Sequence, residues 1–246
     1  MRVTIVGATG RAGHRVLTHA LAAGHTVRAL VRSREKLLAQ LGGAPPHNLN
    51  VQVGDAEDLD TLAAALAGQD AAVQCALTPS YGERFVALDA AFTRLAEKIL
   101  VGSRRVWMFG GVGALDVPGT GLFALDLMRP IFELHRRNWE TLRTSSVDWS
   151  FACPGFMSPE RPAPVVNTSV DVIPIDPPQP ILRDVAALRQ WFTDAFRFLT
   201  VSFDDVARVI LENLGADGPL SRRRVGFVLP DRQKAANERS RGPVAR

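Results

Sequence analysis

Short apolar runs alternate with amphipathic stretches through the first half of the chain. Residues 3–6 form the first apolar run, which ends in a glycine loop, and apolar positions then recur at helical spacing from 13 to 23. The same pattern predicts strands over 26–31, 49–53, 71–76 and 105–109, separated by helices over 34–41, 59–66 and 85–101. Strict alternation of this kind gives right-handed crossovers and a parallel sheet that helices cover on both faces. We therefore predict an α/β protein with a doubly wound parallel Rossmann sheet.

The pattern changes in the second half. A helix over 130–145 and a sixth strand over 148–153 are predicted before Pro154 and Gly155 interrupt the alternation. Residues 156–185 are rich in proline and cannot form a long regular element, whereas helices over 188–199 and 203–214 and a strand over 225–229 follow. The polar sequence after Asp231 predicts a frayed end. These boundaries give a dinucleotide-binding Rossmann core (1–155), a proline-rich and aromatic substrate-lid region with a returning helix and strand (156–230), and a basic C-terminal tail (231–246).

A glycine loop, Gly7-Ala-Thr-Gly10-Arg-Ala-Gly13, joins the first predicted strand to the first helix. In that position Gly7 permits a tight turn, Gly10 lets the backbone approach a pyrophosphate, and Gly13 lets the helix pack on the strand. The N–H groups of the first helical turn would then face the anion. The candidate phosphate-binding residues are Gly7, Thr9, Gly10, Arg11, Ala12 and Gly13. A glycine turn that binds nothing is the alternative.

The end of the second predicted strand bears on the choice between NAD and NADP. A carboxylate there would bind the ribose 2′-hydroxyl, but the sequence is Val31-Arg-Ser-Arg34, with no acid before Glu35. Arg32 is placed for a bidentate contact with a 2′-phosphate, Arg11 can reach the same group, and Ser33 can add a hydrogen bond. We predict NADP(H) as the cofactor. The alternative for Arg32 is an exposed surface charge.

Composition and charge exclude several classes of protein. Apolar residues make up 46% of the chain, but no run of about 18 of them predicts a transmembrane helix, and the N-terminus has no signal-peptide pattern. We therefore expect a cytoplasmic protein, monomeric or homodimeric. The net charge of +4 is concentrated partly at 222–224 and in the tail, and no basic stripe is interleaved with aromatic residues, so no nucleic-acid groove is predicted. Cys75 and Cys153 lack partners at metal-ligand spacing and read as buried small hydrophobes, so no metal is predicted.

Several strings together resemble one known family. They are the glycine loop, Val27-Arg-Ala-Leu-Val-Arg32, Val53-Gly-Asp55, Leu62-Ala-Ala-Ala-Leu-Ala-Gly68, Asp148-Trp-Ser-Phe-Ala-Cys-Pro-Gly155 and Val201-Ser-Phe-Asp-Asp-Val-Ala-Arg208. The chain resembles the atypical short-chain dehydrogenase/reductases of the NAD(P)H-binding, NmrA-like kind, which include flavin and quinone reductases. The resemblance covers 1–155 and 200–215.

The resemblance also implies where the rest of the cofactor would lie. Asp55 and Ala56 would lie beside the adenine, and Cys75-Ala76-Leu77 along the ribose and nicotinamide side. Phe109-Gly110-Gly111 would lie under the nicotinamide, and Pro154 to Phe156 beside its carboxamide.

The proton relay of ordinary superfamily members is missing. That relay consists of a Tyr-x-x-x-Lys pair and a serine at the end of the fifth strand. Here the only tyrosine is Tyr81, after the fourth strand, and the serine position reads Gly110-Gly111. Hydride transfer to a flavin, a quinone or another conjugated acceptor does not require the pair, because the cofactor carries the chemistry.

Two side chains are candidates for assisting such a transfer. His135 lies on the helix after the fifth strand, with a packing or surface histidine as the alternative. Tyr81 follows the fourth strand, near the crevice where such sheets bind ligands, with a loop aromatic that packs on the lid as the alternative.

The aromatic residues of the C-terminal region bear on the substrate. Trp191, Phe192, Phe196 and Phe198, with Phe156 and Met157, read mostly as core, but any that line the pocket favour a flat apolar or aromatic substrate. The leading hypothesis is an NADPH-dependent reductase of a conjugated, aromatic, quinone or flavin-like molecule. The alternatives are a non-catalytic NADP(H) sensor that binds a regulator, and an isomerase or dehydratase with a bound cofactor.

Overall fold

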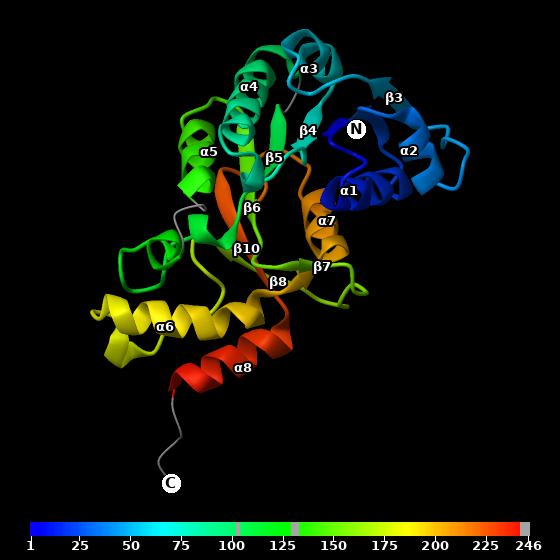
Figure 1. The fold of residues 1–246 in the computed structure, drawn as a ribbon. Helices are drawn as coiled ribbons and strands as arrows, with labels where there is room; N and C mark the ends of the chain where they lie inside the picture. Colours follow the sequence, from blue (N-terminus) through cyan, green and yellow to red (C-terminus); the bar gives the residue numbers. More distant parts are fainter. Residues whose placement is uncertain (102–103, 129–132, 242–246) are drawn as a thin grey trace.

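The seven predicted strands and one further strand, β8, form an eight-stranded sheet (Figure 1) in the computed structural model, which describes residues 1–101, 104–128 and 133–241. From edge to edge the strands are β3 (Leu49–Val53), β2 (Thr26–Val31), β1 (Arg2–Val6), β4 (Ala71–Gln74), β5 (Arg105–Phe109), β6 (Asp148–Cys153), β10 (Arg223–Val228) and β8 (Asn167–Val170). Neighbouring strands are parallel, except that β8 runs antiparallel to β10. The doubly wound Rossmann sheet is therefore confirmed.

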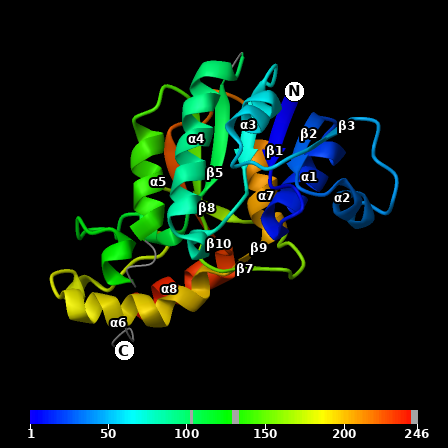
Figure 2. The ribbon, with the colours of Figure 1, turned by 45° about the horizontal axis from the view of Figure 1, so that its top comes forward.

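Helices cover both faces of this sheet (Figures 1 and 2), as the alternation predicted. One face carries α1 (Arg11–Ala22), α2 (Arg34–Gln40) and α7 (Phe203–Glu212); the other carries α3 (Leu59–Leu66), α4 (Glu83–Ile99) and α5 (Glu133–Arg143). Asp204 on α7 accepts a hydrogen bond from His19 Nε2 of α1 at 3.0 Å, which ties the two helices together. Of the helix predicted over 130–145, residues 130–132 lie outside the described residues.

The C-terminal region contains elements that the pattern did not predict. β7 (Met157–Ser158) and β9 (Val201–Ser202) form a separate two-stranded parallel ribbon, and α6 (Val185–Ala195) begins three residues before the predicted start. The predicted frayed end was wrong for residues 230–241, which form α8 (Pro230–Arg241). Residues 242–246 of the predicted tail lie outside the described residues.

Tertiary contacts explain why this polar segment is helical. Ala236 is only 4% exposed, Arg232 donates a hydrogen bond to the Thr200 carbonyl at 2.7 Å, and the Trp191 indole N–H donates to Ser240 at 3.3 Å. α8 therefore lies beside α6 in both ribbon views (Figures 1 and 2) and closes the end of the molecule opposite α3.

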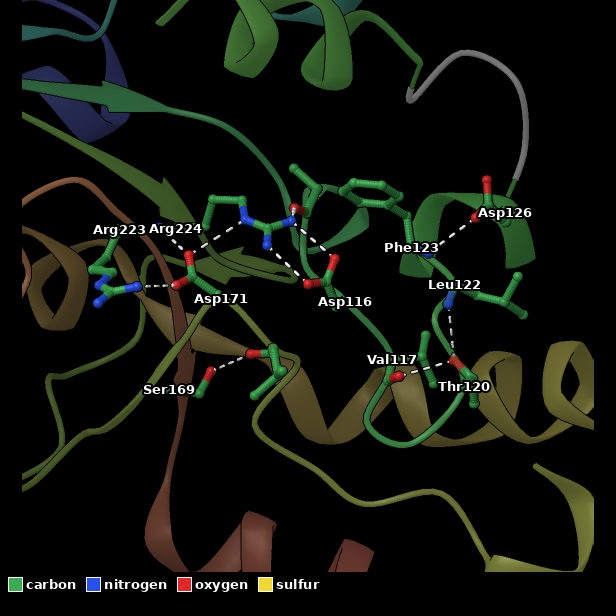
Figure 3. Close-up of polar contacts among 12 residues, drawn as sticks. Asp116, Val117, Thr120, Leu122, Phe123, Asp126, Ser169, Asp171, Arg223 and Arg224 are labelled. Carbon is green, nitrogen blue, oxygen red and sulfur yellow. Dashed lines mark hydrogen bonds and ion pairs between the residues drawn. The ribbon is translucent and has the colours of Figure 1, made fainter. Parts of the chain in front are cut away.

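Buried Arg224 of β10 joins the C-terminal region to the connection after β5 (Figure 3). Its guanidinium donates two hydrogen bonds to Asp116, at 2.9 and 3.0 Å, and one to the Ala114 carbonyl at 2.8 Å. Asp171, which follows β8, lies 3.4 Å away. The guanidinium carbon also lies 4.5 Å from the centre of the Trp139 ring. Three segments far apart in the sequence therefore meet at one arginine.

Candidate functional site

The glycine loop closes β1 and begins α1. Gly7 has φ +79°, in the left-handed region, and a Cβ there would come within 2.8 Å of the Ala76 backbone. Gly13 is also confined, because a Cβ would overlap the Gly7 carbonyl. Gly10 is the N-cap of α1 and supplies no side chain to cap it, so the first-turn N–H groups of the helix have no intrahelical acceptor and suit an anion.

A cavity of about 320 Å³ lies at the carboxyl ends of β1, β2, β3 and β4. Of the residues predicted from the sequence, those that line it are Gly7, Thr9, Gly10, Arg11, Ala12, Arg32, Asp55, Ala56, Cys75, Ala76, Leu77 and Tyr81. Gly13, Ser33, Phe109, Gly110, Gly111, His135, Pro154 and Phe156 do not line it. The structure thus brings together most of the residues predicted for phosphate, ribose and adenine, with Cys75–Leu77 beside them. It leaves outside this cavity the residues after β5 and β6 that were predicted for the nicotinamide.

Further lining residues were missed by the sequence reasoning. They are Leu30, Val31, Lys36, Gly54, Glu57, Thr78, Leu88, Met157 and Phe203. Lys36 had a usable signal, since it follows Arg32 by four residues on the first turn of a predicted helix. Met157 and Phe203 had none, because only the β7–β9 ribbon and the packing of α7 on α1 bring them to the cavity.

The cationic end of the cavity contains Arg32 and Lys36. Ser33, predicted to contact the same group, instead caps α2: its hydroxyl accepts from the Lys36 N–H at 3.0 Å and donates to Glu35 at 3.0 Å. Arg11 lies toward α7, with its guanidinium carbon 5.3 Å from the centre of the Phe203 ring. The cavity therefore has positively charged side chains at two places, near α2 and near α7.

A buried hydrogen-bond network holds the backbone that forms the cavity floor. Gln74, the last residue of β4, accepts from the Ala76 N–H at 3.0 Å and donates to the Ala76 carbonyl at 3.1 Å. Its amide also donates to Asp89 of α4 at 2.8 Å, and Asn138 of α5 donates to the other oxygen of the same carboxyl. Burial raises the pKa of Asp89 from 3.8 to about 8. Burial also raises the pKa of the Cys75 thiol, which disfavours the thiolate at this wall of the cavity.

The two glycines after β5 are required by packing. A Cβ at Gly110 would overlap the Phe151 ring, and a Cβ at Gly111 would lie 3.0 Å from the His135 ring. His135 is 6% exposed, lies edge-on to Phe85, and has no partner for Nδ1 among the described residues. Burial lowers its pKa from 6.5 to about 4, so the imidazole is neutral at physiological pH. The imidazole thus occupies the space beside residue 111.

Tyr81 has different neighbours from His135. It is 47% exposed, and the guanidinium of Arg84 lies 5.7 Å from its ring centre. Arg84 in turn pairs with Glu57, which follows β3. The structure therefore does not bring the two candidate assisting residues together.

An aromatic cluster lies beyond β6. Pro154 is buried, whereas Phe156 is 61% exposed and meets Phe196 edge-on, with ring centres 4.8 Å apart. Phe196 packs in the same way on buried Phe192 of α6, at 5.6 Å. Phe192 is a core residue, and Trp191, Phe196 and Phe198 are partly buried against the same core. Phe156 is the exposed end of the cluster.

Comparison with known proteins adds the family. The sequence profile of a family described as NAD(P)H-binding matches residues 7–217, which is most of the chain. This protein belongs to that NAD(P)H-binding family. Its match to protein C2A9.02 of Schizosaccharomyces pombe is 33% identical over 109 residues, 43% of this chain and 35% of that protein. The match therefore spans about a third of the length of this curated relative.

Solved structures show where else this NAD(P)H-binding fold occurs. A candidate epimerase from Bacteroides thetaiotaomicron has a TM-score of 0.72 at 19% identity, covering 92% of this chain and 96% of that one. ChuY, an anaerobilin reductase from Escherichia coli, has a TM-score of 0.67 at 18% identity, covering 94% and 98%. A candidate NADH-flavin reductase from Streptococcus pneumoniae has a TM-score of 0.64 at 20% identity, covering 93% and 99%. At these identities the likeness shows the fold. Within 1–101, 104–128 and 133–241, each helix is too short or too polar to span a bilayer.

Proposed function

We propose that this protein is an NADPH-dependent oxidoreductase that transfers hydride to a flat conjugated acceptor of the flavin or quinone class. The observation that carries the proposal is the cavity itself, which joins an uncapped helix N-terminus in a glycine loop to Arg32 and Lys36. Such a donor set fits a dinucleotide with an extra phosphate, and no carboxylate stands directly after β2 to select a free ribose hydroxyl. Reductases of a flavin and of anaerobilin among the structural neighbours support an acceptor of this kind.

The chain contributes binding and orientation more than proton transfer. The reduced nicotinamide supplies the hydride when it is bound. The α1 N-terminus would hold the pyrophosphate, and the network of Gln74 and Asp89 keeps the Ala76 backbone of the cavity wall in place. Phe156, exposed beyond β6, offers an aromatic ring against which a flat acceptor can lie. A flavin or quinone then draws its proton from water.

His135 fits a positioning role in this scheme. It is neutral and buried, and its ring supports the backbone of Gly111 at the end of β5. We therefore propose that it keeps Gly110–Gly111 in place and does not titrate during turnover. An ionisation near pH 6.5 in the turnover profile that disappears in His135→Gln would contradict this role.

The test is NADPH oxidation, followed at 340 nm, with a panel of flavins and quinones. We expect turnover of at least one acceptor, faster with NADPH than with NADH. No oxidation above background for any acceptor would sink the proposed reaction.

A non-catalytic NADP(H) sensor is the second candidate. It is favoured by the packing of Gly110 against Phe151, which leaves no space for the serine of the usual relay. It predicts a protein partner that is recovered from a cell extract only with cofactor present, together with no turnover of the acceptor panel. Equal recovery of partners with and without NADPH would remove it.

A further inference from the structure

The segment after β4 folds back toward the connection after β3. A single turn of 3₁₀ helix over Pro79–Tyr81 stands between Leu77, with φ +62°, and Gly82, with φ +57°. Thr78 and Ser80 share a hydroxyl hydrogen bond of 2.7 Å within this turn. The two left-handed residues and this bond give the turn a defined shape. Tyr81, at its end, lines the cavity while remaining 47% exposed.

An ion pair closes the space between the two connections. Arg84, in the first turn of α4, donates from Nε to Glu57 Oε1 at 2.9 Å and makes a second contact through Nη2. The Glu57 N–H donates to Asp55 at 3.0 Å, so the connection after β3 is itself ordered. Because the Arg84 guanidinium also lies over the Tyr81 ring, these side chains form one bridge, which we call the clasp: Glu57, Tyr81 and Arg84.

The clasp lies on the adenosine side of the cavity. If the α1 N-terminus takes the pyrophosphate and Arg32 takes the 2′-phosphate, the cofactor runs outward from β1 past β2, and its base lies toward β3. Glu57 and Asp55 follow β3, directly beyond Arg32 at the end of β2. Tyr81 reaches these residues through Arg84, whereas His135 and Gly111 lie at the end of β5. An exposed aromatic ring that lines this part of the cavity suits stacking on a purine.

We propose that Tyr81 is a cofactor-positioning residue that stacks on the adenine ring, and that the Arg84–Glu57 ion pair holds it there. This inference rests on the proposed cofactor, and it assigns the only tyrosine of the chain to binding instead of proton transfer. The ion pair is exposed, so it opens readily and sets how fast the cofactor leaves more than how tightly it binds.

Calorimetry on the full chain tests the inference with NADPH and with adenosine 2′,5′-bisphosphate, which lacks the nicotinamide half. Tyr81→Ala is expected to weaken both by about tenfold, which corresponds to about 1.4 kcal/mol. Tyr81→Phe keeps the stacking ring and should bind both ligands as the wild type does. Arg84→Met should raise the NADPH dissociation rate several-fold in stopped flow. Arg137→Met is the matched control, since it removes a similarly exposed α4–α5 ion pair with Glu83 away from the cavity.

Each remaining outcome overturns the inference. If the wild type binds both ligands and Tyr81→Ala binds them equally well, the stacking of Tyr81 is contradicted and the proposed cofactor is not. A loss of turnover in Tyr81→Phe with unchanged binding would instead make Tyr81 a proton donor. Equal dissociation rates for Arg84→Met and Arg137→Met contradict the role of the ion pair. Failure of the wild type to bind NADPH would remove the proposed function, and this inference with it.

Discussion

Arg32 is the residue on which the proposed preference for NADPH depends. It is exposed at the carboxyl end of β2, and Lys36 faces the same cavity from the first turn of α2. A guanidinium binds a phosphate through charge-assisted hydrogen bonds, which a free ribose hydroxyl does not offer. Ser33 does not line the cavity, and its hydroxyl caps α2 by accepting from the Lys36 N–H.

Arg32→Ala is therefore expected to weaken NADPH binding by about 10–100-fold, while NADH binding changes little. Arg34→Ala is the control, because Arg34 is also exposed and nearby but does not line this cavity. Titration of each variant with both cofactors measures the effect. Equal losses for NADPH and NADH, or no loss for either, would contradict the assignment of Arg32 to the 2′-phosphate.

Asp89 couples the stability of the cavity floor to pH. Its pKa is raised from 3.8 to about 8 by burial, so the folded protein holds a proton that the unfolded chain releases. The stability that this group contributes is present below pH 3.8 and is lost as the pH rises through 8. His135 contributes in the opposite sense, with stability present above pH 6.5 and lost as the pH falls toward 4.

Between pH 6.5 and 8 the free energy of unfolding of the wild type should therefore fall, and Asp89→Asn should remove most of this slope. An amide is neutral at every pH and can still hydrogen-bond to Gln74 and Asn138. Urea unfolding at three pH values in this window measures the slope. His135→Phe serves as the comparison, because it should keep this fall and make it steeper near pH 6.5, where the imidazole of the unfolded chain is still half protonated. The same slope in wild type and Asp89→Asn would show that Asp89 is ionised in the folded protein.

At the scale of elements, the sequence pattern was sufficient wherever an element carried its own periodicity. β2, β3, β5 and β6 begin and end at the predicted residues, because each is an apolar run bounded by turn residues. β7 and β8 were not predicted because they lie within the proline-rich stretch 156–185, and β9 was not predicted because it has only two residues. α8 has no apolar stripe and forms through contacts with Thr200 and Trp191, which no local pattern contains.

The candidate site divides in the same way. The glycine loop and Arg32 were found because backbone conformation and charge are local properties of the sequence. Gly110 was predicted to lie under the nicotinamide, which stays a prediction, and the structure adds a constraint that the sequence did not reveal: a Cβ there would overlap the Phe151 ring of β6. Lys36, Glu57 and Phe203 join the cavity through tertiary packing.

At the scale of the whole molecule, Arg224 holds the C-terminal region against the Rossmann sheet. Its side chain is 7% exposed and pairs with Asp116 and Asp171, so removing it leaves Asp116 without its ion-pair partner and Asp171 with Arg223 alone (Figure 3). Those carboxylates are 41% and 28% exposed, so water can compensate for part of the loss. The effect should therefore be smaller than for a fully buried pair.

Arg224→Met is expected to lower the free energy of unfolding by about 2 kcal/mol. This is less than the loss expected for a fully buried ion pair, because solvent screens the two carboxylates. It should raise the KM for the acceptor and leave NADPH affinity unchanged, because the cavity lies at the ends of β1 to β4, and β5 and β6 separate those strands from β10. Arg223→Met removes a more exposed partner of Asp171 and is the control. Urea unfolding and steady-state kinetics measure both variants. Loss of NADPH affinity in Arg224→Met would contradict the separation of the two regions.

The sequence by itself determined the parallel α/β sheet, the phosphate-binding loop and the cationic end of the cavity. These depend on periodicity, on glycine at one turn and on charge at the end of one strand, which neighbouring residues specify. Only the tertiary structure decided that His135 is buried and neutral, that Tyr81 joins Glu57 through Arg84, and that α8 is a helix. Each of these depends on burial or on contact with residues distant in the sequence. A pKa or a pocket wall is a property of that surrounding packing, and no window of sequence contains it.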